Sequence, residues 1–345
     1  MSLPPPDCTY LLGLIDDTGI FEHSRYGVPR REHGYTVDDA SRALIVLCDA
    51  QEFEPVMAPM RVLLACILDS MTPEGRFRNR LSFDRRWIEE PGTDDTQGRA
   101  IWALSVVATR AAAIELREAA SSALADIPPI ESEHLRPLAY ASMGAHALWA
   151  AGQHMSLASS LALPYAGRLR DGIGTWPEPR LTYGNGRIPA GMLAAGTVCA
   201  DDELIGRGLE ALSWLVTTET RDGQFSFTPV GGWEPGESRP AFDQQPIEAS
   251  AMSDACERAW AITGEDHWRE YVLRCGEWLV GANDSRVSLY EPSSGATADG
   301  LMSGGVNANK GAESTIAGLA VLQACRRMVT SVPVGRHGEE VNLRP

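Results

Sequence analysis

The sequence lacks several features that would point to particular classes of protein. Its 345 residues contain seven cysteines, which are scattered singly and form no CxxC pair, as is typical of reduced thiols in a cytoplasmic protein. No run approaches the roughly 18 apolar residues of a membrane span. The first residues, MSLPPPDCTYLLGLIDD, have neither the basic nor the apolar stretch of a signal peptide. We therefore expect a cytoplasmic protein with no membrane partner.

Positive charge and paired histidines are also scarce. The formal net charge is -16, whereas a nucleic-acid-binding protein needs a basic surface, so we expect no nucleic-acid partner. The seven histidines form no HxxxH or HxH pair, which argues against a histidine-built metal site. The sequence predicts neither a metal nor another cofactor.

The chain does contain a succession of alanine- and leucine-rich segments with helical periodicity. They fall into pairs, in which the first member is apolar nearly all round and the second is amphipathic. A helix of the first kind is buried on all sides, and one of the second kind faces water. We expect helices near residues 38–51, 55–71, 95–109, 111–125, 136–151, 155–170, 188–200, 202–218, 247–263, 265–281 and 313–328.

The first helices of the pairs begin near residues 38, 94, 136, 188, 247 and 312, which defines six hairpins with variable loops. Six hairpins can close into a ring, and the segment Tyr10–Ile15 would supply the missing partner of the last helix. We predict an all-α fold, an (α/α)6 toroid that spans residues 1–330 as a single domain, with a tail at 331–345. An open solenoid of stacked hairpins is the alternative.

The loops between hairpins carry a second repeat. PEGRFRN (73–79), DGIGTWPE (171–178) and DGQFSFTP (222–229) each follow an outer helix, and ADGLMSGG (298–305) is a weaker copy. Asp-Gly predicts a turn, and the alternating residues after it favour a short strand. We expect short β-hairpin loops gathered at one end of the toroid, around its mouth, where long loops often carry function.

Four inner helices begin with a carboxylate, namely Asp39, Asp95, Glu248 and Glu313. They belong to hairpins one, two, five and six, which are consecutive around a closed ring. One side of the mouth should therefore be acidic.

Helix capping is the plainer explanation for such acids. Thr36 would cap the helix that contains Asp39, and Asp94 or Thr93 would cap the next inner helix. Neighbouring helical residues point about 100° apart, so one member of each Asp-Asp pair should cap and the other should face the funnel. We predict that Asp39 and Asp95 face inward.

Paired carboxylates at a mouth are suited to glycoside cleavage, which needs one acid and one base or nucleophile. Glu248 has apolar neighbours that should raise its pKa, so we predict that it is the general acid. Asp39 or Asp95 would activate water, in an inverting arrangement because the acids lie on different helices. The predicted substrate-binding residues are Asp38, Asp94, His33, Tyr35, Arg42, Trp176, Gln245, Asn307, Asn309, Lys310 and Glu313, the last of which would hold a sugar hydroxyl.

Three stretches also resemble a known group: GYTVDDASRAL, DDTQGRAIWAL and GLMSGGVNANKGAESTIAGLAVL. They are similar to the six-hairpin-glycosidase-like domains that accompany bacterial glycosyltransferases and β-mannoside phosphorylases, from about Asp16 to Met328. Ser41 stands where that pattern usually has Asn, and Lys310 where it often has Gln. The resemblance implies the toroid fold and a glycan or oligosaccharide substrate, with a glycosyltransferase as a candidate partner.

These observations favour a glycoside hydrolase acting on a bacterial glycan or oligosaccharide. A non-catalytic glycan-binding or glycosyltransferase-partner domain is the main alternative. A sugar epimerase would need a histidine pair at the mouth, and the sequence places only His33 there. A terpene cyclase or prenyltransferase would need an aromatic-lined cavity or a zinc site, whereas the inner helices are rich in alanine.

Overall fold

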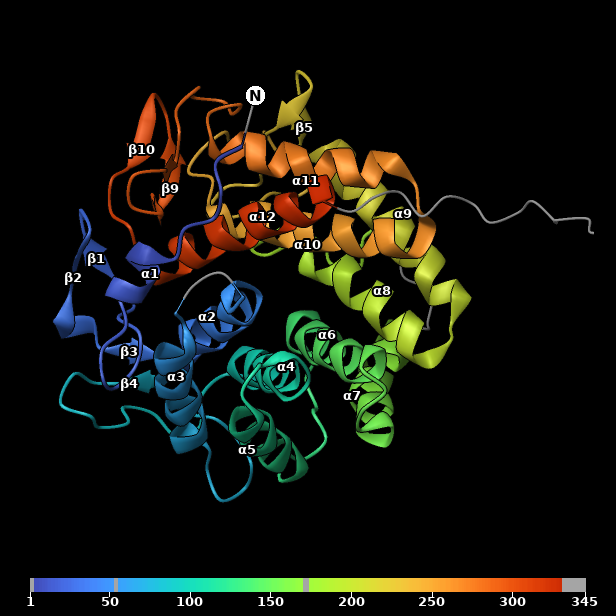
Figure 1. Cartoon of the computed structure of the whole chain (residues 1–345). Coiled ribbons are helices and arrows are strands. Elements are labelled where there is room, and N and C mark those ends of the chain that lie inside the picture. Colours follow the sequence, from blue (N-terminus) through green and yellow to red (C-terminus); the bar gives the residue numbers. More distant parts are fainter. Residues whose placement is uncertain (1–2, 53–54, 170–173, 331–345) are drawn as a thin grey trace, which may run out of the picture.

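The computed structural model describes residues 3–52, 55–169 and 174–330, so the predicted tail lies outside the described residues. Its helices form two layers around a common centre (Figure 1). Each inner helix contacts the next, and the last contacts the first, which closes the ring and confirms the (α/α)6 toroid. The inner helices are α2 (Val37–Ala50), α4 (Asp94–Arg110), α6 (Leu135–Ala150), α8 (Arg187–Cys199), α10 (Pro246–Thr263) and α12 (Ala312–Thr330).

Each outer helix packs against the inner helix of its own hairpin. The predicted helices are confirmed to within a few residues at each end. The short α1 contacts α12, so the N-terminal segment does take the place of the missing sixth partner. The outer helices are α1 (Thr9–Gly13), α3 (Met57–Ser70), α5 (Ile114–Ala125), α7 (Met155–Leu169), α9 (Asp202–Thr218) and α11 (Asp266–Leu279).

Small residues let the inner helices approach closely. A Cβ atom added at Gly98 of α4 would lie 2.4 Å from the carbonyl oxygen of Pro137 in α6, and one at Gly191 of α8 would lie 2.5 Å from the Cβ atom of Ala139. Both distances are far shorter than a van der Waals contact. The alanine- and glycine-rich composition of the inner helices therefore fixes the radius of the ring.

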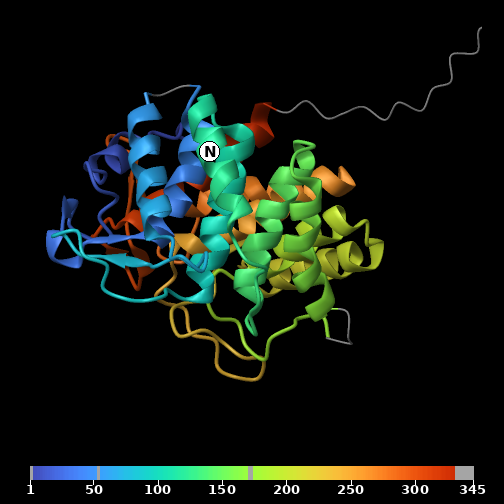
Figure 2. The ribbon, with the colours of Figure 1, turned by 90° about the horizontal axis from the view of Figure 1, so that it is seen from below.

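Short antiparallel hairpins decorate the loops. In one of them Asp222 and Gly223 both have positive φ, which is the turn predicted from Asp-Gly. Figure 2 shows the long loops that precede α4, α8 and α10 together at one end of the bundle, as expected for a mouth. The strand pairs are β1 (Ser24–Arg25) with β2 (Val28–Pro29), β3 (Tyr35–Thr36) with β4 (Arg80–Leu81), β5 (Thr220–Arg221) with β6 (Gln224–Phe225), β7 (Tyr290–Glu291) with β8 (Ala296–Thr297), and β9 (Gly300–Met302) with β10 (Gly305–Asn307).

Candidate functional site

A polar pocket of about 410 Å³ lies at the starts of α2 and α12, and we call it the acidic pocket. Among the described residues, six of its lining side chains are carboxylates and two are arginines, so the formal charge of this lining is negative. It contains six of the residues predicted from the sequence. Its lining is Glu22, His23, Thr36, Asp38, Asp39, Arg42, Asn79, Arg80, Val230, Asp243, Gln245, Asp299, Gly300, Asn307, Gly311, Glu313 and Ser314.

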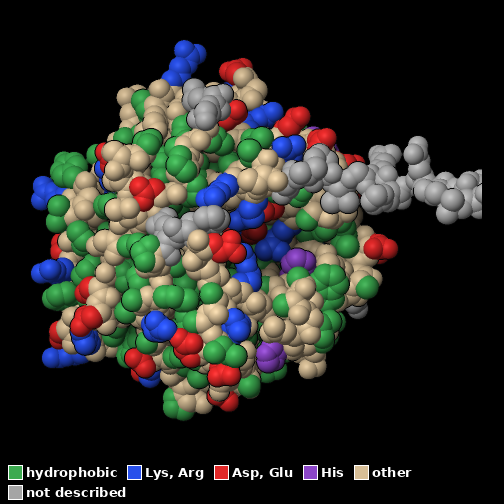
Figure 3. Space-filling model, viewed as in Figure 1, with side chains coloured by type: hydrophobic (Ala, Val, Ile, Leu, Met, Phe, Trp, Pro, Cys, Tyr) green, Lys and Arg blue, Asp and Glu red, His purple; other side chains and the backbone are tan. Residues whose placement is uncertain are grey.

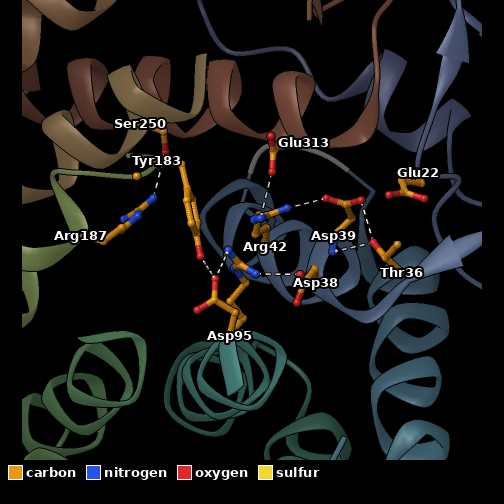
Figure 4. Close-up of polar contacts among 12 residues, drawn as sticks. Glu22, Thr36, Asp38, Asp39, Arg42, Asp95, Tyr183, Arg187, Ser250 and Glu313 are labelled. Atoms are coloured by element: carbon orange, nitrogen blue, oxygen red, sulfur yellow. Dashed lines mark hydrogen bonds and ion pairs between the residues drawn. The ribbon is translucent and has the colours of Figure 1, made fainter. Parts of the chain in front are cut away.

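One guanidinium joins two of the predicted acids (Figure 4). Arg42 Nη1 lies 2.7 Å from Asp39 Oδ1, and Arg42 Nη2 lies 3.0 Å from Glu313 Oε2. Asp39 comes from the first turn of α2 and Glu313 from the first turn of α12, which are neighbours only because the ring closes. The two carboxylates are thus held side by side, separated by one arginine head group.

The two acids differ strongly in their environment. The side chain of Asp39 is 5% exposed, and that of Glu313 is 39% exposed. Burial raises the pKa of Asp39 to about 6; the charge of Arg42 opposes this rise, and the negative charge of Glu313 adds to it. One carboxyl group of the pair therefore holds a proton to higher pH than an ordinary aspartate, while its partner faces water.

Asp38 and Asp95 meet at a second guanidinium. Arg99, which is 5% exposed, lies 2.7 Å from Asp38 Oδ2 and 3.1 Å from Asp95 Oδ2. Tyr183 also donates a hydrogen bond to Asp95 (Figure 4). Asp95 does not line the acidic pocket, whereas Asp38 does, so the inward orientation of Asp95 stays a prediction. Oδ1 of Asp38 is buried and has no hydrogen-bond partner among the described residues.

The N-terminal caps of α2 and α4 agree only in part with those predicted from the sequence. Thr36 caps α2 by accepting the backbone N–H of Asp39, as predicted. In α4 the cap is Thr93, so of the two caps considered for this helix Asp94 is wrong. Asp94 instead lies in the first turn, where it accepts hydrogen bonds from Arg76 at 2.8 Å and Ser132 at 2.9 Å.

Glu248 is buried in the first turn of α10 and does not line the acidic pocket. Its carboxyl oxygens accept hydrogen bonds from the backbone N–H groups of Gly184 and Asn185 and from the Asn185 side chain. Burial, together with the charge of Glu219, raises the pKa of Glu248 to about 8, and the backbone hydrogen bonds oppose this rise. Its predicted role as general acid stays a prediction, since these contacts tie it to the loop before α8.

The structure brings a second histidine to His33. The ring of His23 meets the ring of His33 edge-on, with centroids 4.8 Å apart. His23 lines the acidic pocket and its side chain is 48% exposed, whereas His33 Nε2 is buried and has no partner among the described residues. The sequence-based argument that no second histidine lies near His33 is therefore wrong.

Other predicted residues lie away from the acidic pocket. Tyr35 is buried, donates a hydrogen bond to Asp16 at 2.6 Å and stacks on Phe21. Trp176 is half-buried and stacks on Trp214 with centroids 5.3 Å apart.

Asn309 and Lys310 are also engaged outside the acidic pocket. Asn309 accepts the backbone N–H of Tyr26 at 3.3 Å, and Lys310 pairs with Glu291 at 2.6 Å. Neither residue lines the acidic pocket.

Sequence reasoning missed several pocket residues. Asp299 belongs to the ADGLMSGG stretch, which predicts only a turn, yet its carboxylate accepts the backbone N–H of Gly311 at 2.6 Å and burial raises its pKa. Glu22 and Arg80 form a two-pronged ion pair across 58 positions of sequence. Asp243 lies two residues before the predicted Gln245, which is the one local signal that could have found it.

Within the described residues, no group of three or more histidine, cysteine, aspartate or glutamate side chains is arranged to hold a metal ion. Among the same residues, no helix is long and apolar enough to cross a membrane.

No protein-family model matches the chain, and no curated protein matches it in sequence. Solved structures do match over nearly the whole chain. A sugar epimerase from a ruminal bacterium superposes with a TM-score of 0.66 and 14% identity, covering 91% of this chain and 94% of that chain. The cellobiose 2-epimerase of Bacillus thermoamylovorans gives a TM-score of 0.67 and 10% identity, covering 93% and 96%.

A GH76 α-mannanase from Bacteroides thetaiotaomicron gives a TM-score of 0.62 and 9% identity, covering 93% of this chain and 95% of that chain. These structures share the six-hairpin, glycosidase-like (α/α)6 fold. At such low identity the similarity shows the fold alone, because one fold hosts many activities.

Proposed function

We propose that this protein is a carbohydrate-active enzyme that cleaves a glycosidic bond in the acidic pocket. The main support for this proposal is the pairing of Arg42 with both Asp39 and Glu313. The carboxyl group of Asp39 is buried, whereas that of Glu313 faces water. Glycoside hydrolysis needs this asymmetry, because one carboxylic acid must protonate the leaving oxygen while a carboxylate acts as base or nucleophile.

In this proposal Asp39 is the acid, because its pKa is raised to about 6. Glu313 is the base, since a substrate or water molecule can approach its exposed carboxylate. Arg42 keeps a counter-charge beside Glu313 when Asp39 carries its proton. Gln245 and Asn307, which also line the pocket, offer amide groups to sugar hydroxyls.

The assignment predicted from the sequence, with Glu248 as acid and Asp39 or Asp95 as base, is the competing version of this mechanism. It would require Glu248 to leave its contacts with Gly184 and Asn185. Single amide variants separate the two versions, because each version names a different pair of essential acids.

A second candidate is a sugar 2-epimerase. The observation that favours it is the His23–His33 contact at the acidic pocket. Epimerisation next to a carbonyl requires a base that removes a proton from carbon, and histidine suits that role near neutral pH. The epimerases among the structural neighbours add support through the shared fold.

One experiment distinguishes these activities. The protein is incubated in D₂O with manno- and cello-oligosaccharides, and the products are followed by NMR. Hydrolysis creates new reducing ends, whereas epimerisation changes the terminal sugar and introduces deuterium at its C2. Binding without turnover would favour a glycan-binding role beside a partner glycosyltransferase.

The variants then assign the residues. Asp39→Asn and Glu313→Gln should each lower turnover at least ~10²-fold if general acid–base catalysis operates. Glu115→Gln is the matched control, because Glu115 is an exposed glutamate on α5 that pairs with Arg61. Full activity in both pocket variants would contradict the proposal, and loss in Glu248→Gln together with full activity in Glu313→Gln would favour the competing version.

A further inference from the structure

A second, larger cavity opens at the other end of the toroid, and we call it the rear cavity. It has a volume of about 740 Å³ and is lined by residues from all six inner helices, mostly from their middles and C-terminal ends, with Arg187 from the start of α8. Within the part of the chain that the structure describes, it shares no lining residue with the acidic pocket. Its size falls in the range of about 300–1,000 Å³ that is usual for sites of small organic ligands.

Many of the side chains that line the rear cavity are charged. Figure 3 shows basic and acidic side chains gathered around a hollow near the middle of this face. The charged lining residues are the four arginines Arg110, Arg187, Arg258 and Arg327 and the three carboxylates Asp49, Asp254 and Glu257.

The rear cavity has one positive charge in excess. Its lining histidine, His146, is neutral near pH 7, because burial and the nearby charge of Arg258 lower its pKa to about 4. Among the described residues of the lining, the four arginines therefore face three carboxylates. The acidic pocket has the opposite sign, and so does the whole chain, with a net charge of -16.

Two of the four arginines are stabilised by their position at the C-terminal end of a helix. Arg110 is the last residue of α4, and Arg327 lies in the last turn of α12. A cation there is stabilised by the negative end of the helix macrodipole. Both side chains also pair with Asp49, and Arg327 pairs with Glu257 as well. This outer part of the cavity is electrostatically balanced.

The other two arginines do not lie at the C-terminal end of a helix. Arg187 is the first residue of α8, and Arg258 lies inside α10, so neither is stabilised by the C-terminal end of its own helix. They share a single carboxylate, with Arg187 Nη1 2.6 Å and Arg258 Nε 3.2 Å from Asp254.

The surplus charge therefore resides at Arg187 and Arg258. Burial lowers the pKa of Arg187, and the charges of Arg258 and Arg42 act in the same direction against Asp254. Stacking of Arg187 on Trp102 at 5.1 Å stabilises the cation but does not neutralise it. An uncompensated buried charge is costly unless something pairs with it.

The walls around this pair are apolar. Trp102, Met143, Leu193 and Ala194 line the cavity beside the two arginines. A ligand that fits both features has one anionic group and an apolar or flat body. Guanidinium groups recognise carboxylate and phosphate oxygens well, because their planar N–H donors match the geometry of these anions.

We propose that the rear cavity binds a small organic oxyanion, a carboxylate- or phosphate-bearing molecule, through Arg187 and Arg258. This site is separate from the acidic pocket and does not depend on the activity proposed there. A toroid with an acidic pocket at one end and a cationic cavity at the other takes two chemically different ligands.

Calorimetric titration of the full chain at low salt tests the proposal. The probes are benzoate and phenyl phosphate, with benzyl alcohol as the neutral match. At least one oxyanion should bind at least ~10-fold more tightly than benzyl alcohol, since hydrogen bonds from a guanidinium group to an anion are stronger than those to a neutral hydroxyl group. The comparison of the two oxyanions shows whether carboxylate or phosphate is preferred. Equal affinity for all three probes, or no binding of either oxyanion, overturns the proposal.

Variants locate the site. Arg187→Gln and Arg258→Gln should each weaken oxyanion binding at least ~10-fold. Arg61→Gln, which alters an exposed arginine on α3, should leave it unchanged. Asp254→Asn raises the positive excess and should tighten binding, so it decides the question if the arginine variants do not fold. Unchanged affinity in folded arginine variants, or weaker binding in Asp254→Asn, contradicts the proposal.

Discussion

The raised pKa of Asp39 should make the stability of the protein depend on pH in a defined direction. The folded state holds a proton on Asp39 up to about pH 6, whereas an ordinary aspartate has a value of 3.8. The associated stability is fully present below about pH 4 and is lost as the pH rises through 6. Asp39→Asn removes this titration.

The size of the effect follows from the shift. A difference of roughly 2 pKa units corresponds to about 3 kcal/mol, at 1.36 kcal/mol per unit. Between about pH 4.5 and about pH 7.5 the wild type should lose most of this free energy relative to Asp39→Asn. For 345 residues and an unfolding entropy of about 2.1 cal/mol/K per residue, the roughly 2 kcal/mol lost over this range is a change of about 3 °C in the difference between the melting temperatures.

The assay is thermal unfolding of both proteins across this pH range, followed by circular dichroism. Any pH-independent loss from the broken contacts with Arg42 and Thr36 is common to all points, so only the slope matters. Asp17→Asn is the control, because a hydrogen bond from Arg85 lowers the pKa of that exposed aspartate. Its ionisation changes only below this range, so its slope should be flat. A flat or opposite slope for Asp39→Asn would refute the reasoning.

Three further predictions concern stability and local structure. Glu248→Gln should lower the melting temperature by several degrees, because it weakens the hydrogen bonds that hold the loop before α8. An unchanged melting temperature would show that these hydrogen bonds are not needed to hold that loop. Gly98→Ala should lower the free energy of unfolding, measured in urea, by about 1–3 kcal/mol, because the added Cβ atom would clash with Pro137 of α6. An unchanged free energy of unfolding would show that the ring can widen. Thr93→Ala should cost about 1 kcal/mol through loss of the α4 cap, and Asp94→Ala should leave that cap intact; hydrogen exchange of the first turn of α4 separates the two.

Local rules account for what the sequence determines about this protein. Periodicity defines the helices, because a buried helix and a half-buried helix need different patterns of apolar residues over a few turns. The cap at Thr36 and the turn at Asp222 are likewise set by neighbouring backbone groups. Six hairpins and a spare N-terminal helix are enough to predict the closed ring.

The composition of the candidate site depends on contacts that no local pattern contains. Asp39 and Glu313 are far apart in sequence and meet only because α12 packs against α2. His23 reaches His33 through the path of the loop between α1 and α2.

Tertiary structure also decided which predicted residues face the pocket. Glu248 and Tyr35 are residue types that are common in carbohydrate sites. However, the carboxylate of Glu248 is hydrogen-bonded to the backbone at residues 184–185, and the hydroxyl group of Tyr35 is hydrogen-bonded to Asp16. A side chain near a helix start can turn toward the axis, toward a loop or toward a neighbouring helix with little change in local energy. The partners that distant segments supply select among these directions, so sequence determined the ring and tertiary packing determined the site.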